Sequence, residues 1–139
     1  MKLDAAATTI CYFNGRWTEG PVPLMTSATN AAWLANTVFD GARAFEGVAP
    51  DLDLHCERVI HSAHGLNLQP TRTAAEILAL AKEGIRFFPH GAPLYIRPMF
   101  WAETGLMLIE STQFALVITK MPRLRQNQVA AKISRCQNV

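Results

Sequence analysis

Two arginines lie among aromatic residues in segments that alternate like β-strands. In the segment 38–45, VFDGARAF, alternation places four residues on one side of a strand: Phe39, Gly41, Arg43 and Phe45. In the segment 93–101, PLYIRPMFW, the same rule aligns Tyr95, Arg97, Met99 and Trp101. A guanidinium matches a carboxylate or phosphate and stacks on aromatic rings, so two such rows facing one cavity could hold an organic acid with an apolar tail. Alternatively, both arginines lie on the solvated face of a half-exposed sheet.

A third arginine, Arg58, lies in the segment 49–66, APDLDLHCERVIHSAHGL, whose apolar residues have helical spacing. These residues share one face: Cys56, Val59, Ile60, Ala63 and Leu66. Arg58 falls nearly opposite that face. Its position alone therefore predicts a solvated side chain.

Several common kinds of site are absent from the sequence. The four histidines, His55, His61, His64 and His90, have no HxxxH or HExxH spacing, which argues against a metal site and suits surface histidines. No GxSxG, P-loop or GxGxxG motif occurs. The three cysteines have no CxxC spacing, which argues against a disulfide framework and against zinc.

Composition narrows the class of protein. The 139 residues are enough for about one domain, and half of them are apolar. Thirteen Lys and Arg against eleven Asp and Glu give a net charge of +2, so no nucleic-acid or membrane partner is expected. The first ten residues lack the apolar stretch of a signal peptide, and no run approaches the roughly 20 apolar residues of a spanning helix. We expect a soluble cytoplasmic protein that binds a small molecule or another protein.

The elements that must position the arginines can be predicted from local patterns. Residues 10–13 and 16–18 form a hairpin around a type I′ turn at Asn14-Gly15. A short helix follows within 26–36, with three candidate caps: Ser27, Thr29 and Asn30. Residues 38–45 then form a strand.

A second helix begins near Thr73, because Thr73 and Glu76 have the spacing of a capping box. Its apolar stripe comprises Ile77, Leu78, Ala81, Ile85 and Phe88, and Pro89 ends it. Strands over 93–101 and 114–120 follow, and 129–135 is a weak strand. A hairpin, consecutive helices and then strands predict an α+β fold, with an antiparallel sheet and helices on one side.

Four segments together resemble the N-terminal part of class IV aminotransferases, the branched-chain aminotransferase group. These segments are YFNGRWTEG, NTVFDGARAFEG, DLHCERVIHSAHGL and YIRPMFW, in this order. The resemblance covers about residues 10 to 122. It implies that residues 1–122 form the small N-terminal domain of a fold type IV pyridoxal phosphate enzyme. Residues 123–139 would then be a linker and the first strand of the larger domain.

The resemblance also assigns roles to the arginines. It implies that Arg58 binds the phosphate of pyridoxal 5′-phosphate, and that five residues contact the substrate: Phe39, Gly41, Arg43, Tyr95 and Arg97. It further implies a homodimer acting on amino acids and 2-oxo acids. At Leu34 the sequence departs from the family, many of whose members have a tyrosine there, so a particular substrate preference does not carry over.

The catalytic lysine is a second departure. Transamination needs a lysine that forms a Schiff base with the cofactor, and in this family it lies in the larger domain. Only Lys2, Lys82, Lys120 and Lys132 occur. The first three lie in the wrong elements, and Lys132 follows YIRP too soon and matches a surface position. The resemblance therefore predicts that this chain is an inactive, truncated form.

Three functions are compatible with these features. The first is an aminotransferase acting between a branched-chain amino acid and 2-oxoglutarate. The second is a D-amino acid or amine transaminase, or an aminodeoxychorismate lyase-like enzyme. The third is a non-catalytic module that dimerises around Trp33, Phe39 and Trp101. In a truncated enzyme, we expect Phe39 and Trp101 to lie exposed beside the two strand arginines.

Overall fold

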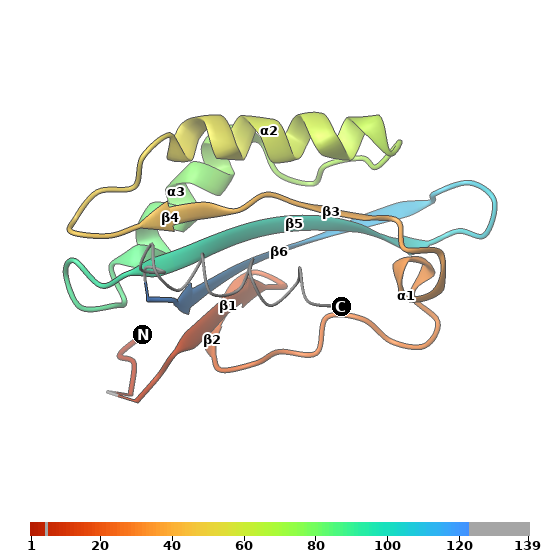
Figure 1. Ribbon diagram of the computed structural model, residues 1–139. Coiled ribbons are helices and arrows are strands. Elements are labelled where there is room, and N and C mark those ends of the chain that lie inside the picture. Colours follow the sequence, from red (N-terminus) through yellow and green to blue (C-terminus); the bar gives the residue numbers. More distant parts are fainter. Residues whose placement is uncertain (5, 123–139) are drawn as a thin grey trace, which may run out of the picture.

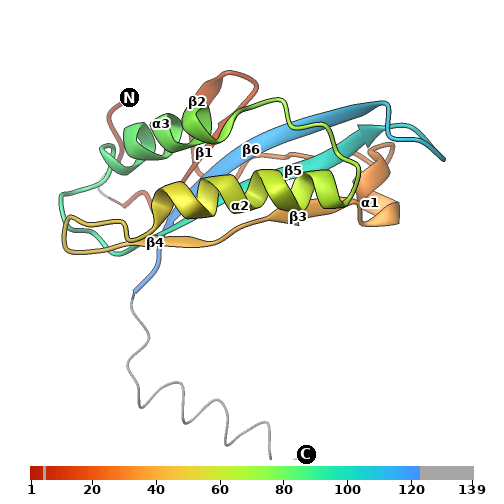
Figure 2. The ribbon, with the colours of Figure 1, turned by 90° about the horizontal axis from the view of Figure 1, so that it is seen from above.

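The computed structural model describes residues 1–4 and 6–122. At its centre is a six-stranded sheet with the order β2-β1-β6-β5-β3, in which β4 also pairs with β5 and every pairing is antiparallel. Two long helices, α2 and α3, lie side by side over one face of this sheet (Figures 1 and 2). The predicted α+β fold, an antiparallel sheet with helices on one side, is confirmed.

The N-terminal hairpin forms as predicted. Strands β1 (Thr9–Phe13) and β2 (Arg16–Glu19) pair around Asn14 and Gly15. These two residues have φ of 50° and 80°, and a type I′ turn requires positive φ at both positions. Asn and Gly are the residues that tolerate this backbone best, so the local sequence alone specifies the turn.

The prediction of one strand over 38–45 is wrong, because two short strands replace it: β3 (Thr37–Phe39) and β4 (Ala42–Ala44). Both pair with β5 (Leu94–Thr104) in one continuous register. Between them, the N–H of Asp40 donates to the carbonyl of Pro98 at 3.1 Å, but Pro98 has no N–H with which to return the second bond. The ladder is therefore interrupted while the alternation of side chains continues.

Helix α2 (Leu52–Gly65) buries most of its predicted apolar face. Cys56, Val59 and Ala63 are buried and Ile60 is half-buried. The prediction for Leu66 is wrong, since this residue is exposed. The helix ends one residue earlier, and the turn that follows brings Leu68 into the core instead.

Helix α3 (Ala74–Ile85) begins with the predicted capping box. The N–H of Glu76 donates to Oγ1 of Thr73 at 3.2 Å, and the N–H of Thr73 donates to Oε2 of Glu76 at 2.7 Å. Each bond satisfies a backbone donor that the first helical turn leaves free. The helix ends at Ile85, before Pro89, and Phe88 is still buried beyond it.

Gly84 allows α3 to approach the sheet closely. A Cβ at this position would lie 2.5 Å from Cδ1 of Ile118 and 2.5 Å from Cη2 of Trp17. We expect Gly84→Ala to lower the free energy of unfolding by about 1–2 kcal/mol, because overpacking outweighs the better helix propensity of alanine. Urea denaturation measures this difference.

Gly65→Ala is the matched control, since this glycine is also helical but has no atom within 4 Å of an added Cβ. It should leave the free energy of unfolding unchanged or raise it slightly. Equal stabilities for the two variants would show that α3 does not rest tightly on the sheet.

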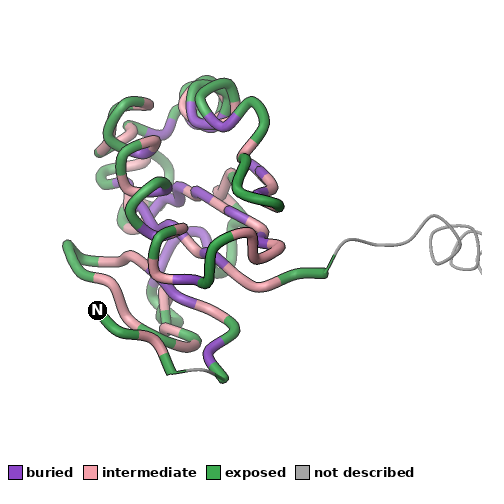
Figure 3. The backbone as a smooth tube through the Cα atoms, turned by 90° about the vertical axis from the view of Figure 1, so that its left-hand side faces the viewer, coloured by how far each residue is buried: buried purple, intermediate pink, exposed green. Residues whose placement is uncertain are grey.

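Strand β5 and strand β6 (Ser111–Lys120) form the centre of the sheet and carry two different faces. The face toward α2 and α3 is buried at alternate β5 positions: Leu94, Ile96, Pro98, Phe100 and Ala102. In Figure 3 the buried positions gather in the interior of the molecule, between the exposed outer segments. The opposite face is covered at one end by the short helix α1 (Asn30–Leu34), which packs through Ala31.

Thr29, one of the three candidate caps, occupies the N-cap position of α1. Its side chain does not cap the helix. Instead, its hydroxyl accepts a bond from the N–H of Thr26 and donates to Glu103 on β5.

Among the described residues, no helix is both long and apolar enough to cross a membrane.

Candidate functional site

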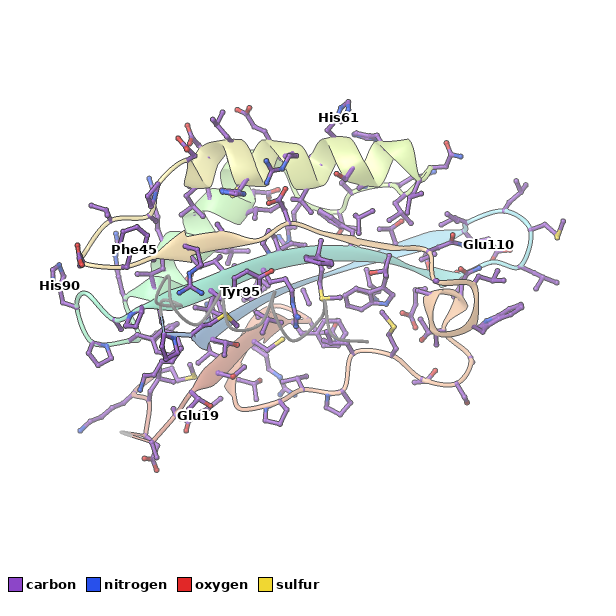
Figure 4. The ribbon with its side chains drawn as sticks, in the orientation of Figure 1. Glu19, Phe45, His61, His90, Tyr95 and Glu110 are labelled. Atoms are coloured by element: carbon purple, nitrogen blue, oxygen red, sulfur yellow. The ribbon has the colours of Figure 1, made fainter. Side chains whose placement is uncertain are left out.

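The candidate substrate residues gather on the sheet face opposite α2 and α3. We call this the arginine face, and it carries Gly41, Arg43, Tyr95 and Arg97. Arg43 lies directly opposite Tyr95, and the continuous register places Gly41 opposite Arg97. Residues that face each other across an antiparallel pair project to the same side. Figure 4 labels Tyr95 where β5 runs beside β4.

Tyr95 requires the glycine beside it. A Cβ at position 41 would lie 2.5 Å from Oη and 2.8 Å from Cε2 of Tyr95. The aromatic ring therefore lies across the backbone of Gly41, and any side chain at this position would force the ring to move. This contact holds the phenol group over the arginine face and gives a physical reason for the glycine in the FDG segment.

Arg97 is partly buried at the centre of this face. Its Nε is buried and has no hydrogen-bond partner within the described part of the chain. Burial raises the pKa of the Cys11 thiol, and the positive charge of Arg97 nearby lowers it again in part. A buried donor without an acceptor costs about 1–3 kcal/mol, so this position favours an acceptor from a ligand.

Arg43 has a structural bond that its sequence position did not indicate. Its Nη2 donates to the backbone carbonyl of Met121 at 2.6 Å. The guanidinium thus reaches across the sheet to the residue that follows β6. This bond occupies one donor of the guanidinium. It also links β4 to the residue that follows β6.

The two aromatic residues expected to be exposed differ from each other. Phe39 is 59% exposed, as expected, but Trp101 is completely buried and that expectation is wrong. Trp101 packs with Phe13, and its indole N–H donates to Glu103 at 2.8 Å. Helix α1 covers it through Ala31. Because Phe39 shares the alternation of Gly41 and Arg43, the arginine face is open at Phe39 and closed where α1 covers Trp101.

Arg58 lies apart from the arginine face, on α2, and contacts the edge of the sheet through Asp40. Its Nε donates to Oδ2 of Asp40 at 2.5 Å, and its Nη2 donates to Oδ1 at 2.8 Å. The side chain of Arg58 is 63% exposed, whereas that of Asp40 is only 6% exposed. Arg58 is thus both solvated, as its helical position indicates, and held by a buried carboxylate.

His55 completes this cluster from the same helix. Its Nδ1 lies 2.7 Å from Oδ1 of Asp40 and 3.0 Å from Nη2 of Arg58. An ionised carboxylate only accepts and a guanidinium only donates, so the shorter contact places the proton on Nδ1. The interpretation of all four histidines as surface residues is therefore wrong for His55, whereas His61 points away from the sheet (Figure 4).

The charges of this cluster determine the ionisation of Asp40. Burial alone raises the pKa of its carboxyl group. Hydrogen bonds from Arg58 and His55, together with their charges, outweigh burial and bring the pKa below its usual value. The same carboxylate raises the pKa of Arg58 through hydrogen bonding and charge.

This lowered pKa predicts a contribution of Asp40 to acid sensitivity. The folded state binds the Asp40 proton less tightly than the unfolded state. The carboxylate therefore stabilises the protein above its unfolded pKa of about 3.9, and this stabilisation is lost as the pH falls through the folded pKa. We expect the free energy of unfolding to decline less below about pH 4 in Asp40→Asn than in the unmodified protein. Urea denaturation between mildly acidic and strongly acidic pH measures this, and parallel declines in the two proteins would contradict it.

A separate cavity of about 520 Å³ lies on the helix side of the sheet. Its walls are mainly apolar, including Leu52, Leu78 and Ile85, with Lys82 and Arg86 at α3. By shape alone this is the better pocket. The arginine face differs from this cavity in having a charged donor, Nε of Arg97, that is buried and has no partner among the described residues.

The three lysines of the described residues do not converge on the arginine face. Lys82 lines the helix-side cavity, and Lys120 lies over the ring of Phe88, 5.9 Å from its centre. Lys2 is exposed near the N-terminus. Lys132 and the strand predicted over 129–135 lie outside the described residues.

Comparisons with known proteins show the fold and the class to which the chain is similar. A search against protein-family models finds no match. A probable branched-chain-amino-acid aminotransferase of Rickettsia typhi is 31% identical over 112 residues, which are 77% of this chain and 38% of the relative. An aminotransferase from Brucella abortus, solved bound to the cofactor PLP, is 46% identical with a TM-score of 0.81. That match covers 85% of this chain and 44% of the other.

Structures that are less similar in sequence share the same fold. A branched-chain aminotransferase from the archaeon Thermoproteus uzoniensis, solved with norvaline, has a TM-score of 0.71 at 22% identity. It matches 85% of this chain, which spans 42% of its length. The fold is thus that of the N-terminal part of class IV, fold type IV aminotransferases. Within this class, the chain is homologous to the pyridoxal phosphate-dependent branched-chain type.

Proposed function

We propose that residues 1–122 are the small domain of an aminotransferase that transfers an amino group between a branched-chain amino acid and 2-oxoglutarate. The single observation that carries this proposal is the buried, unpartnered Nε of Arg97 beside Tyr95 on an open face. A substrate carboxylate would supply the missing acceptor. Phe39 and Gly41 would contact the apolar part of the substrate, and Arg43 would add positive charge at its edge.

We propose that pyridoxal 5′-phosphate is the cofactor and that Arg58 holds its phosphate. Among the described residues, no hydrogen bond involves Nη1 of Arg58, and the side chain is largely exposed, so the donor set suits a phosphate. When bound, this cofactor supplies the carbonyl that takes up the amino group. The role of this chain is to bind and orient: Arg58 fixes the phosphate, while Tyr95 and Arg97 orient the substrate carboxylate.

A homodimer in the cytoplasm is part of the proposal. The β5–β6 loop exposes three large apolar side chains: Leu106, Met107 and Leu108. Such a patch favours burial against another protein surface. The same patch also supports the third candidate function, a non-catalytic dimerising module.

A chimera tests the proposed function. In it, residues 1–122 replace the matching N-terminal part of the Brucella abortus aminotransferase. We expect the chimera to retain pyridoxal 5′-phosphate and to transfer amino groups from leucine, isoleucine and valine to 2-oxoglutarate. Faster reaction with D-alanine or a simple amine would favour the D-amino acid or amine transaminase. A folded chimera with bound cofactor and no transferase activity would favour the non-catalytic module.

The positions of the lysines lead to a further expectation. We propose that the 139-residue chain is inactive by itself, because Lys2, Lys82 and Lys120 all lie away from the arginine face. Borohydride reduction with pyridoxal 5′-phosphate, followed by peptide mapping, should label no single lysine stoichiometrically. Specific labelling of Lys132 would instead make the chain a compact enzyme with its own catalytic lysine.

A further inference from the structure

Asp40 is a carboxylate on the side of the strand where its neighbours are apolar. It projects toward α2, between Val38 and the buried Ala42, and is only 6% exposed. Its backbone lies at the interruption between β3 and β4, where its N–H donates to Pro98. A buried charge is costly unless it is paired and hydrogen-bonded, so its partners show what it does.

The partners of Asp40 fix the orientation of one side chain. Nε and Nη2 of Arg58 donate to the two carboxylate oxygens, which sets the plane of the guanidinium. His55 donates to the same carboxylate from the preceding turn of α2 and so holds it from a second point. Both N–H groups of Nη1 remain on the side of the guanidinium that points away from Asp40.

We propose that Asp40 is a positioning residue that holds the guanidinium of Arg58 ready for a phosphate monoester. This inference rests on the proposed role of Arg58 in cofactor binding. An exposed arginine has many rotamers, and fixing one of them before the ligand arrives removes an entropic cost from binding. Asp40 accepts hydrogen bonds from two of the five N–H donors of Arg58, and both N–H groups of Nη1 stay available to the ligand.

For Asp40→Asn, positioning and simple electrostatics predict opposite changes in the affinity for phosphate. Asp40 carries a negative charge close to the proposed phosphate, and this charge repels the ligand. If only charge mattered, Asp40→Asn would strengthen phosphate binding, and Asp40→Glu would leave it unchanged. If positioning dominates, both variants weaken binding, because neither presents two charged oxygens at the right distance from Arg58.

The experiment titrates the 139-residue chain with pyridoxamine 5′-phosphate and, separately, with pyridoxamine, followed by NMR. Neither probe has an aldehyde, so neither reacts with lysines, and the ratio of the two affinities isolates the phosphate. We expect the chain to prefer the phosphorylated probe. Asp40→Asn and Asp40→Glu should each reduce that preference about fivefold. Asp53→Asn, which removes an exposed charge from the first turn of α2, is the control and should not reduce it.

The outcomes separate this inference from the proposed function. If Arg58→Ala abolishes the preference but both Asp40 variants keep it, the positioning role is wrong while the role of Arg58 stands. If Arg58→Ala keeps the preference, the role of Arg58 in cofactor binding is wrong. The positioning role of Asp40 would also be wrong if the unmodified chain showed no preference for the phosphorylated probe, or if Asp40→Asn strengthened that preference. Should Asp40→Asn not fold, Asp40→Glu, which keeps the charge, decides alone.

Discussion

Replacing Arg58 by alanine is expected to weaken retention of pyridoxal 5′-phosphate by about thirtyfold in the chimera, the effect of losing one charge-assisted hydrogen-bonding partner. The helix should persist, because its buried face of Cys56, Val59 and Ala63 is untouched. Equilibrium dialysis of the cofactor measures retention, and circular dichroism reports the fold.

Arg86→Ala is the matched control for this prediction. Arg86 is an exposed arginine at the end of α3, on the helix side of the sheet, so the two variants lose the same charge. Arg86→Ala should change retention little. Equal losses in both variants would mean that general positive charge attracts the cofactor, and that Arg58 has no specific role.

Replacing Arg97 by methionine is expected to change stability and substrate binding in opposite directions. Methionine has a similar length and no polar hydrogen, so the variant no longer buries a donor without an acceptor. The free energy of unfolding of the chain should rise by about 1 kcal/mol or stay unchanged. In the chimera, the KM for 2-oxoglutarate should rise at least about thirtyfold, since a paired carboxylate loses its guanidinium.

Arg97→Lys distinguishes charge from geometry at this position. A lysine keeps the positive charge but lacks the planar fork that pairs with both oxygens of a carboxylate. We expect its KM to lie between those of the unmodified chimera and Arg97→Met. An Arg97→Met variant that loses several kcal/mol of stability would show that the guanidinium is a structural group, and would remove the main support for a substrate site here.

Much of the fold could be predicted because its signals are local. The Asn14-Gly15 turn and the Thr73–Glu76 capping box each depend on residues at most three positions apart. The same is true of the alternation that places Arg43 and Arg97 on one side of their strands. The shared face of these two arginines also follows once the strands pair, because alternation survives the interruption at Asp40.

Other features depend on partners that are distant in sequence. The interruption between β3 and β4 arises because Pro98, on another strand, cannot donate a hydrogen bond. Trp101 is buried because α1 folds over it from a segment about seventy residues earlier, a separation that no local pattern records. A lone aspartate on an apolar strand face was the one available signal for the Asp40 cluster.

The sequence by itself determined the Asn14-Gly15 turn, the capping box of α3, the alternation and the resemblance to an aminotransferase small domain, because these depend on short-range sterics and on residue order. Only the tertiary structure decided which charges meet. It joined Asp40 to His55 and Arg58, tied Arg43 to Met121, and left Nε of Arg97 without an acceptor among the described residues. The physical reason is that hydrogen bonding and burial depend on distances between chain segments, and packing sets those distances.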